Sequence, residues 1–186
     1  MYQWGAQSSV IRDLFTYGRE QAAKIGDENV FDFSIGNPTV PAPECIKDAV
    51  TEIMETRTAV AVHGYTAAAG DPVVRKGLAD YMNKTFNAGV EAGNFYMTCG
   101  AAASLTITLK ALVESPDDEI VVIAPYFPEY TAFIKNSGAE KVVVPPDMES
   151  FQIPFDALEQ AITSKTRALI INSPNNPSGV VYSEDT

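Results

Sequence analysis

The chain has 186 residues and a formal net charge of -11, with 46% hydrophobic and 20% charged residues. These values are typical of a soluble globular protein of one domain, or of one domain and part of another. The negative charge argues against nucleic acid and anionic membranes as partners, because both require a basic surface. The sequence has no apolar run long enough to cross a membrane and no signal peptide at its start, so we expect a cytoplasmic protein. Cys45 and Cys99 lack disulfide or metal-ligand patterns, so no metal site is predicted.

The first third of the chain predicts helices and turns. A helix is expected over Ser9–Lys24, and a short extended segment over Val30–Ile35, where apolar residues alternate. The loop Gly36–Pro43 is rich in turn residues and cannot be helical. Pro43 suits the first position of a helix that reaches about Thr56. Asp71 followed by proline predicts the start of another helix.

From Asn94 onward, short apolar strands alternate with helices. Strands that are apolar throughout, rather than alternately apolar and polar, are typical of a mostly parallel sheet covered by helices on both faces. The predicted fold is therefore α/β. In chain order the expected elements are a strand over Phe95–Thr98, a helix over Ala101–Glu114, a strand over Glu119–Ala124, a helix over Glu129–Ser137 closed by Gly138, a strand over Lys141–Val144, a helix over Phe155–Ile162 and a strand over Arg167–Asn172.

The last four residues, Ser183-Glu-Asp-Thr186, have the composition of a helix cap and a first turn. A single turn is unstable by itself, because helix nucleation is costly. We therefore expect this chain to be part of a longer protein.

Three loops follow, or are expected to follow, the carboxyl ends of strands, where ligands bind in open parallel sheets. The first is Thr98-Cys-Gly-Ala-Ala-Ala-Ser104, in which small side chains would let an anion approach the start of a helix. Taken alone, this loop also fits a tight turn that requires Gly100 for its backbone angles. It matches neither a Walker A loop nor a dinucleotide fingerprint.

The second loop, Ala124-Pro-Tyr-Phe-Pro-Glu-Tyr130, contains three aromatic residues that could stack on a planar ligand or belong to the core. The third loop, Asn172-Ser-Pro-Asn-Asn-Pro-Ser-Gly179, could hold Asn176 in one geometry, although asparagine is also a common turn former.

Together, and in this order, these segments resemble the class I/II aminotransferases, the pyridoxal-phosphate (PLP) fold family that includes aspartate aminotransferase. The resemblance covers nearly the whole chain. Its motifs are Phe33-Ser-Ile-Gly-Asn-Pro38, His63-Gly-Tyr-Thr66 with Gly70, the Gly100 loop, Pro125-Tyr-Phe-Pro128 and Asn175-Asn-Pro-Ser-Gly179. The last is the most diagnostic, although Ser178 stands where the family usually has threonine.

The resemblance implies roles for five cofactor-binding residues. Gly100, Ala101 and Ala102 correspond to the backbone donors that cradle the PLP phosphate, with alanine where many members have a hydroxyl or lysine. Phe127 corresponds to the aromatic residue that stacks on the pyridine ring. Asn176 corresponds to the donor to the phenolic oxygen of the cofactor, and it also lies in the substrate site.

Two further residues are assigned by the same resemblance. Gly36 corresponds to a backbone contact near the substrate carboxylate. Tyr65 corresponds to the tyrosine that reaches the cofactor phosphate of the partner subunit, which implies a homodimer with shared active sites. The implied domains are an N-terminal arm and small-domain segment over residues 1–42 and an incomplete PLP-binding large domain over residues 43–186.

The family's lysine that carries PLP as a Schiff base lies further along such chains. Lys165 is in a polar turn and Lys110 is in the middle of a predicted helix, so neither suits that role. No catalytic residue is therefore predicted within this chain, and the 186-residue polypeptide is expected to be inactive by itself.

The expected function of the complete protein is transfer of an amino group between an L-amino acid, with the aspartate type as the first choice, and a 2-oxo acid. Three alternatives remain open. They are a PLP-dependent carbon–sulfur lyase of the same fold, a non-enzymatic aminotransferase-like domain of a regulator, and a doubly wound domain that binds another phosphate compound.

Overall fold

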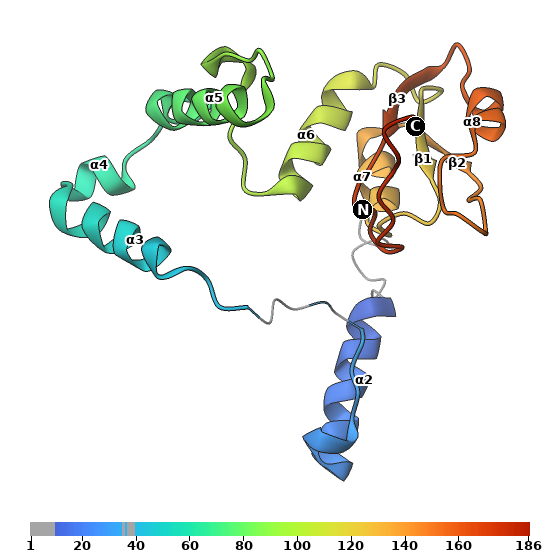
Figure 1. The fold of residues 1–186 in the computed structure, drawn as a ribbon, viewed down its shortest axis with the longest axis horizontal. Helices are drawn as coiled ribbons and strands as arrows, with labels where there is room; N and C mark the ends of the chain where they lie inside the picture. Colours follow the sequence, from blue (N-terminus) through green and yellow to red (C-terminus); the bar gives the residue numbers. More distant parts are fainter. Residues whose placement is uncertain (1–9, 35, 37–39) are drawn as a thin grey trace. The chain divides into compact units, whose positions relative to one another are not determined.

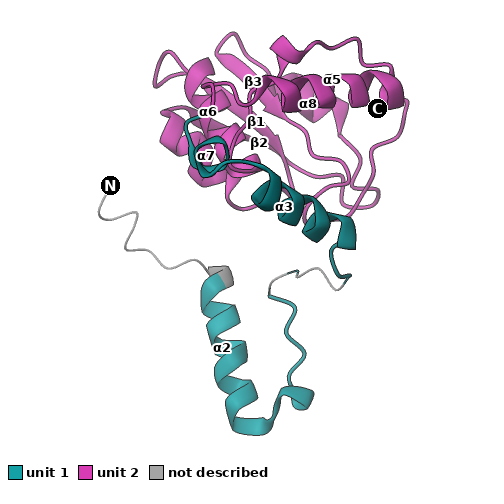
Figure 2. Ribbon diagram, turned by 90° about the vertical axis from the view of Figure 1, so that its left-hand side faces the viewer, with its two compact units in different colours: residues 1–65 teal, residues 66–186 magenta. Residues whose placement is uncertain are grey.

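The computed structural model describes residues 10–34, 36 and 40–186. The chain forms two compact units, Met1–Tyr65 and Thr66–Thr186 (Figure 2). The predicted domain boundary after residue 42 stays a prediction. Within the described residues, no helix is long and apolar enough to cross a bilayer.

The described part of the first unit is helical, as its sequence predicts. The helix expected from Ser9 is observed from Val10, and the helix expected from Pro43 begins one residue later. A short helix, which the sequence did not predict, is capped by the Thr58 hydroxyl, which accepts a hydrogen bond from the backbone N–H of Ala61. The elements are α2 (Val10–Ile25), η1 (Asp27–Asn29), α3 (Glu44–Thr56) and α4 (Ala59–His63).

The predicted extended segment Val30–Ile35 does not form a strand in its described residues. Phe31 and Phe33, the alternating apolar residues, are 81% and 93% exposed. An isolated extended segment has no neighbouring strand to satisfy its backbone groups, so alternation alone does not make it part of a sheet. Ile35 and residues 37–39 of the following loop lie outside the described residues.

The second unit contains the predicted alternation of helices and strands. Its first helix begins as expected, because the Asp71 carboxylate accepts hydrogen bonds from the backbone N–H groups of Val73 and Val74. The elements are α5 (Pro72–Phe86), η2 (Ala92–Asn94), α6 (Ala101–Leu112), β1 (Glu119–Ile123), α7 (Tyr130–Ser137), β2 (Glu140–Val144), α8 (Phe155–Ala161) and β3 (Thr166–Ile170).

The three strands form one parallel sheet in the order β2-β1-β3 (Figure 1). The central strand β1 sends successive side chains to opposite faces. Ile120 and Val122 pack with residues of α6 and α7 on one face. Val121 and Ile123 pack toward α8 on the other face. Helices therefore cover both faces, which confirms the predicted α/β class and explains why β1 is apolar throughout.

Two predicted elements of this unit differ from the structure. Phe95–Thr98 is not a strand; its backbone N–H groups donate to earlier residues, Phe95 to the Ala92 carbonyl and Met97 to the Ala69 carbonyl. Residues 183–186 do not form a helix, although Ser183 accepts a hydrogen bond from the Thr186 N–H in the manner of a cap.

A buried carboxylate ties together the amino ends of the strands. Asp118, which is 4% exposed, accepts hydrogen bonds from the backbone N–H groups of Glu114 (2.7 Å) and Ser115 (2.9 Å) and from Arg167 Nε (2.9 Å). The same contacts explain why α6 stops at Leu112 and not at Glu114, since the Glu114 N–H is taken by Asp118. The Glu114 N–H, then Arg167 and then the Ser115 N–H lower the pKa of Asp118 below its usual value.

We expect Asp118→Asn to lower the urea midpoint of unfolding at pH 7, because the variant cannot offer a charged acceptor to Arg167. A carboxyl whose pKa is lowered by folding stabilises the protein above its unfolded pKa of about 4, and this stabilisation is lost as the pH falls through the folded value. The difference from the unchanged chain should therefore shrink in urea titrations below about pH 4. Asp117→Asn, at the exposed neighbouring position, is the control. Equal midpoints for both variants at pH 7 would contradict the role of Asp118.

Candidate functional site

The parallel sheet brings the three predicted loops to one edge. Since β1 and β3 are neighbouring parallel strands, the loops that follow them, residues 124–129 and 171–179, leave the sheet at the same edge. A short connection joins α6 to β1, and Leu109 of α6 packs against β1. The helix therefore runs antiparallel to that strand, as Figure 1 shows, and its N-terminus lies at the same edge. The candidate site is this edge.

The first loop turns sharply at Gly100, which has φ 89° and ψ 173°. Only glycine adopts this region readily. The Thr98 hydroxyl donates to the Gly100 carbonyl at 3.1 Å and lies 2.5 Å from the Ser104 hydroxyl. These contacts tie the segment before the turn to the first turn of α6, so the direction in which the helix begins is fixed.

The start of α6 is suited to an anion. Among the described residues, no side chain caps this N-terminus. Ala101 and Ala102 are exposed, and a Cβ built on Gly100 would have no neighbour within 4 Å. Their backbone N–H groups are therefore accessible, and the helix dipole adds a favourable field for negative charge.

The second loop holds its aromatic rings in a connected set. Phe127 packs partly against the core and meets the Tyr130 ring edge to face, with centroids 5.7 Å apart. Tyr130 stacks on Tyr126 at 6.4 Å, and its backbone N–H donates to the Phe127 carbonyl. Phe127 is half-buried. Its position is therefore compatible with both interpretations from sequence, a residue of the core and a residue that stacks on a ligand.

A lysine from β2 anchors this aromatic loop. Lys141 Nζ donates to the Tyr126 hydroxyl at 2.6 Å and to the Thr131 hydroxyl at 2.8 Å, and lies 5.0 Å from the centroid of the Tyr126 ring. Burial raises the pKa of Tyr126, but the hydrogen bonds from Lys141 and Thr131 and the charge of Lys141 together outweigh burial, so its pKa is lowered. The sequence analysis did not identify this lysine.

The third loop is built around Asn175, which is 8% exposed. Its side-chain oxygen accepts hydrogen bonds from the Ser178 N–H and hydroxyl, and its backbone pairs with Val180 and Gly179. The side chain of Asn172 accepts from the Asn176 N–H at 2.8 Å. The peptide bonds before Pro174 and Pro177 are cis. The scaffold thus leaves the Asn176 side chain exposed, as a ligand contact requires.

Gly36 and Tyr65 belong to the first unit. Both are exposed, and a Cβ built on Gly36 would have no neighbour within 4 Å. The roles that the resemblance implies for these two residues stay predictions.

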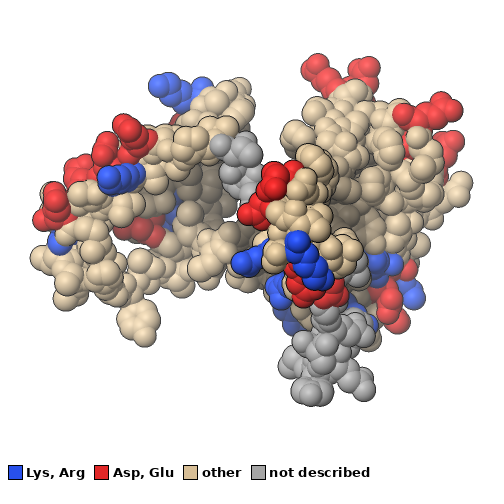
Figure 3. Space-filling view, turned by 90° about the horizontal axis from the view of Figure 1, so that it is seen from below, with Lys and Arg blue, Asp and Glu red and all other residues tan. Residues whose placement is uncertain are grey.

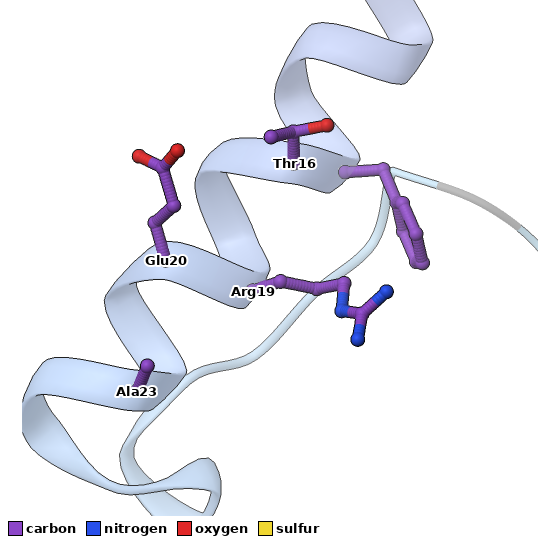
Figure 4. Close-up of a pocket in the computed structure, with 5 residues that line it drawn as sticks. Thr16, Arg19, Glu20 and Ala23 are labelled. Carbon is purple, nitrogen blue, oxygen red and sulfur yellow. The ribbon is translucent and has the colours of Figure 1, made fainter.

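A surface hollow beside α2 is lined by Phe15, Thr16, Arg19, Glu20 and Ala23 (Figure 4). Arg19 lies over the Phe15 ring, 5.9 Å from its centroid, whereas Glu20 leaves the helix in another direction. The lining comes from one helix and its polar groups do not converge, so this hollow is not the candidate site.

The charged side chains of the described residues do not form a second site. In Figure 3 acidic and basic side chains lie close together in some places, and other parts of the face carry acidic side chains alone. Among the described residues, no group of three or more His, Cys, Asp or Glu side chains could hold a metal ion.

Comparison with known proteins gives one consistent family. The model of the family described as aminotransferase class I and II matches residues 28–186. An asparagine–oxo-acid transaminase of Streptococcus mutans is 30% identical over 173 residues, which are 92% of this chain and 43% of that relative. This chain spans less than half the length of that relative.

Solved structures agree in fold. The crystal structure of an amino transferase from Eubacterium rectale is 54% identical, with a TM-score of 0.97 over 100% of this chain and 46% of that chain. Aspartate aminotransferase from Thermus thermophilus with maleate is 27% identical, with a TM-score of 0.82 over 96% of this chain and 45% of that chain.

We expect Gly100→Ala to destabilise the chain by about 1–3 kcal/mol, because alanine is strained at these backbone angles. Gly77→Ala is the matched control. Gly77 lies in the interior of α5, where a Cβ would meet no neighbour within 4 Å. There the same change should stabilise by roughly 0.5–1 kcal/mol. Urea unfolding followed by circular dichroism measures both effects, and effects of the same sign at the two positions would contradict this account of the turn.

Proposed function

The chain belongs to the class I and II aminotransferases, and from this premise we propose that the complete protein transfers an amino group between an L-amino acid and a 2-oxo acid. The observation that carries the proposal is the arrangement of the three loops at one edge of the sheet. The aspartate type is our proposed donor class, because the relatives include a transaminase of asparagine and an aspartate aminotransferase structure with maleate, a dicarboxylate.

We propose PLP as the cofactor because the residues present fit it. PLP combines a phosphate with a planar ring that carries a phenolic oxygen. The N–H groups of Ala101 and Ala102 would hold the phosphate, and the open space at Gly100 leaves room for it. The Phe127 ring would stack on the cofactor ring, and the exposed Asn176 amide would donate to the phenolic oxygen.

These contacts assign different roles to the cofactor and to the residues of this chain. When bound, PLP supplies a ring that withdraws electrons from the carbon attached to the amino group. The residues of this chain bind and orient: the start of α6 fixes one end of the ligand, Phe127 fixes the plane of the ring, and Asn176 favours the ionised phenolic oxygen. In the first unit, Gly36 would contact the substrate carboxylate through its backbone.

Transamination requires a lysine, both to hold PLP and to move the proton, and these loops contain none. There is no lysine in residues 98–104, 124–129 or 171–179. Lys110 donates to the Ser137 carbonyl, and Lys165 is exposed in a turn that precedes β3. We therefore propose that the lysine that carries the cofactor is outside residues 1–186. We also keep, as proposals, an arm and small-domain segment over residues 1–42, a PLP-binding domain from residue 43, and a cytoplasmic location.

The first experiment compares two polypeptides with added PLP, the complete protein and residues 1–186 alone. With aspartate and a 2-oxo acid, the complete protein should form oxaloacetate only when the acceptor is present, and residues 1–186 should give no turnover. Keto-acid release without an acceptor would support a lyase instead. Turnover by residues 1–186, or a single stoichiometric borohydride label on one of their lysines, would contradict the proposed placement of the active-site lysine.

The second experiment tests Asn176 in the complete protein. Loss of a hydrogen bond to a charged group costs about 1.5–3 kcal/mol, so Asn176→Ala should weaken PLP affinity by roughly 10- to 150-fold. The same change should raise the pKa of the pH-dependent visible band of the bound cofactor, because the ionised oxygen loses its donor. Asn136→Ala, on the exposed side of α7, is the control. An unchanged spectral titration for Asn176→Ala would refute its role.

The third experiment concerns assembly. We propose that the complete protein is a homodimer in which Tyr65, fully exposed in its own chain, reaches the cofactor phosphate of the partner. Sedimentation should give a two-chain particle, and Tyr65→Phe should weaken PLP affinity while the dimer persists. An active single-chain particle would rule out shared sites.

A further inference from the structure

The aromatic loop of the candidate site, residues 124–129, is held by the charged side chain of Lys141, whose backbone lies in β2. Lys141 belongs to β2 and pairs in register with Ile120, near the amino end of β1. Its ammonium nevertheless meets the hydroxyl of Tyr126, a residue of the loop that follows the carboxyl end of the same strand. The two side chains therefore connect β2 to the loop that follows β1.

The contacts of Lys141 are stronger than a surface lysine usually makes. Its 2.6 Å and 2.8 Å hydrogen bonds to Tyr126 and Thr131 are charge-assisted. The ammonium also lies 5.0 Å from the Tyr126 ring centroid, within the range of a cation–π interaction. Both acceptors are hydroxyls, and within residues 10–34, 36 and 40–186 no carboxylate forms a salt bridge with Lys141.

The anchor reaches Phe127 through adjoining contacts. Tyr126 precedes Phe127 in the chain and stacks on Tyr130 with an interplanar angle of 11°. Tyr130 in turn makes two contacts with Phe127. Its ring meets the Phe127 ring edge to face, and its backbone N–H donates to the Phe127 carbonyl. Thr131, the second acceptor of Lys141, is the next residue of α7. Tyr130, which contacts the Phe127 ring, is thus linked to Lys141 through Tyr126 and is the neighbour in sequence of Thr131, the other residue that Lys141 contacts.

We propose that Lys141, Tyr126 and Thr131 are positioning residues that orient the Phe127 ring toward the cofactor, an inference that rests on the proposed function. None of the three is placed on the ligand. Their effect is to restrict the loop to the geometry in which the aromatic face meets a planar ring.

The test uses the complete protein, PLP as the probe and three variants. Lys141→Met keeps the length of the side chain and removes its charge, whereas Tyr126→Phe keeps the ring and removes the acceptor. Each should weaken PLP affinity by about tenfold, the scale of one lost charge-assisted hydrogen bond. The double variant should bind PLP no more weakly than Lys141→Met alone, because the hydrogen bond that Tyr126→Phe removes is already lost when Lys141 is replaced. Lys165→Met, in an exposed turn, is the matched control and should leave the affinity unchanged.

A spectroscopic measurement distinguishes a positioning role of Lys141 and Tyr126 from a role in stability alone. With PLP at saturation, the circular dichroism of its visible band reports the asymmetry of its surroundings, and Lys141→Met and Tyr126→Phe should change it in the same way. Lower stability with unchanged affinity and unchanged cofactor dichroism would overturn the inference and leave the proposed function intact. Failure of the unchanged complete protein to bind PLP would refute both. If Lys141→Met does not fold, Tyr126→Phe carries the same test.

Discussion

Parallel pairing of β1 between β2 and β3 is the constraint on which the rest of the second unit depends. Parallel strands end at a common edge, and their connections must cross a face of the sheet. The connections from β1 to β2 and from β2 to β3 run in opposite directions along the sheet, so right-handed crossovers place α7 and α8 on opposite faces and bury the side chains of β1 on both. The loops that follow β1 and β3 leave the sheet at one edge because these strands are parallel, and the start of α6 joins them because this helix packs against β1 and runs antiparallel to it.

The amino and carboxyl ends of the strands differ in how their polar groups are paired. At the amino edge, Asp118 accepts hydrogen bonds from two backbone N–H groups and from Arg167, and so ties the connection between α6 and β1 to β3. At the carboxyl edge, the backbone N–H groups that begin α6 and the Asn176 amide are exposed. Polar groups are thus hydrogen-bonded within the protein at the amino edge, and some are left accessible at the carboxyl edge, where a ligand is expected. Lys141 connects these regions, since its backbone pairs near the amino end of β1 and its ammonium donates to Tyr126 in the loop after the carboxyl end of β1.

Much of this architecture could be predicted from sequence, because apolar strands, caps and glycine turns are local signals. The class of fold, the Asp71 cap and the left-handed Gly138 at the end of α7 were all predicted in this way. The sequence predicted Val30–Ile35 only as an extended segment, and its described residues join no sheet, since alternation does not reveal whether a partner strand exists. The Lys141–Tyr126 contact could not be predicted, because 15 residues separate the pair and only the fold of β1, α7 and β2 brings them together. Asn175 was seen as part of a motif, but its role as the scaffold that exposes Asn176 emerges only from its hydrogen bonds.

The strand order also has a consequence for motion. β1 has a hydrogen-bonded neighbour on each side, whereas β3 has one such neighbour among the described residues. Amide protons of a flanking strand exchange with solvent through smaller openings than those of a central strand. Within the described residues, the segment that carries Asn176 follows a strand with one hydrogen-bonded neighbour, and the segment that carries Phe127 follows a strand with two. A ligand in contact with both segments would connect the carboxyl ends of β1 and β3 a second time, beyond the hydrogen bonds between the strands.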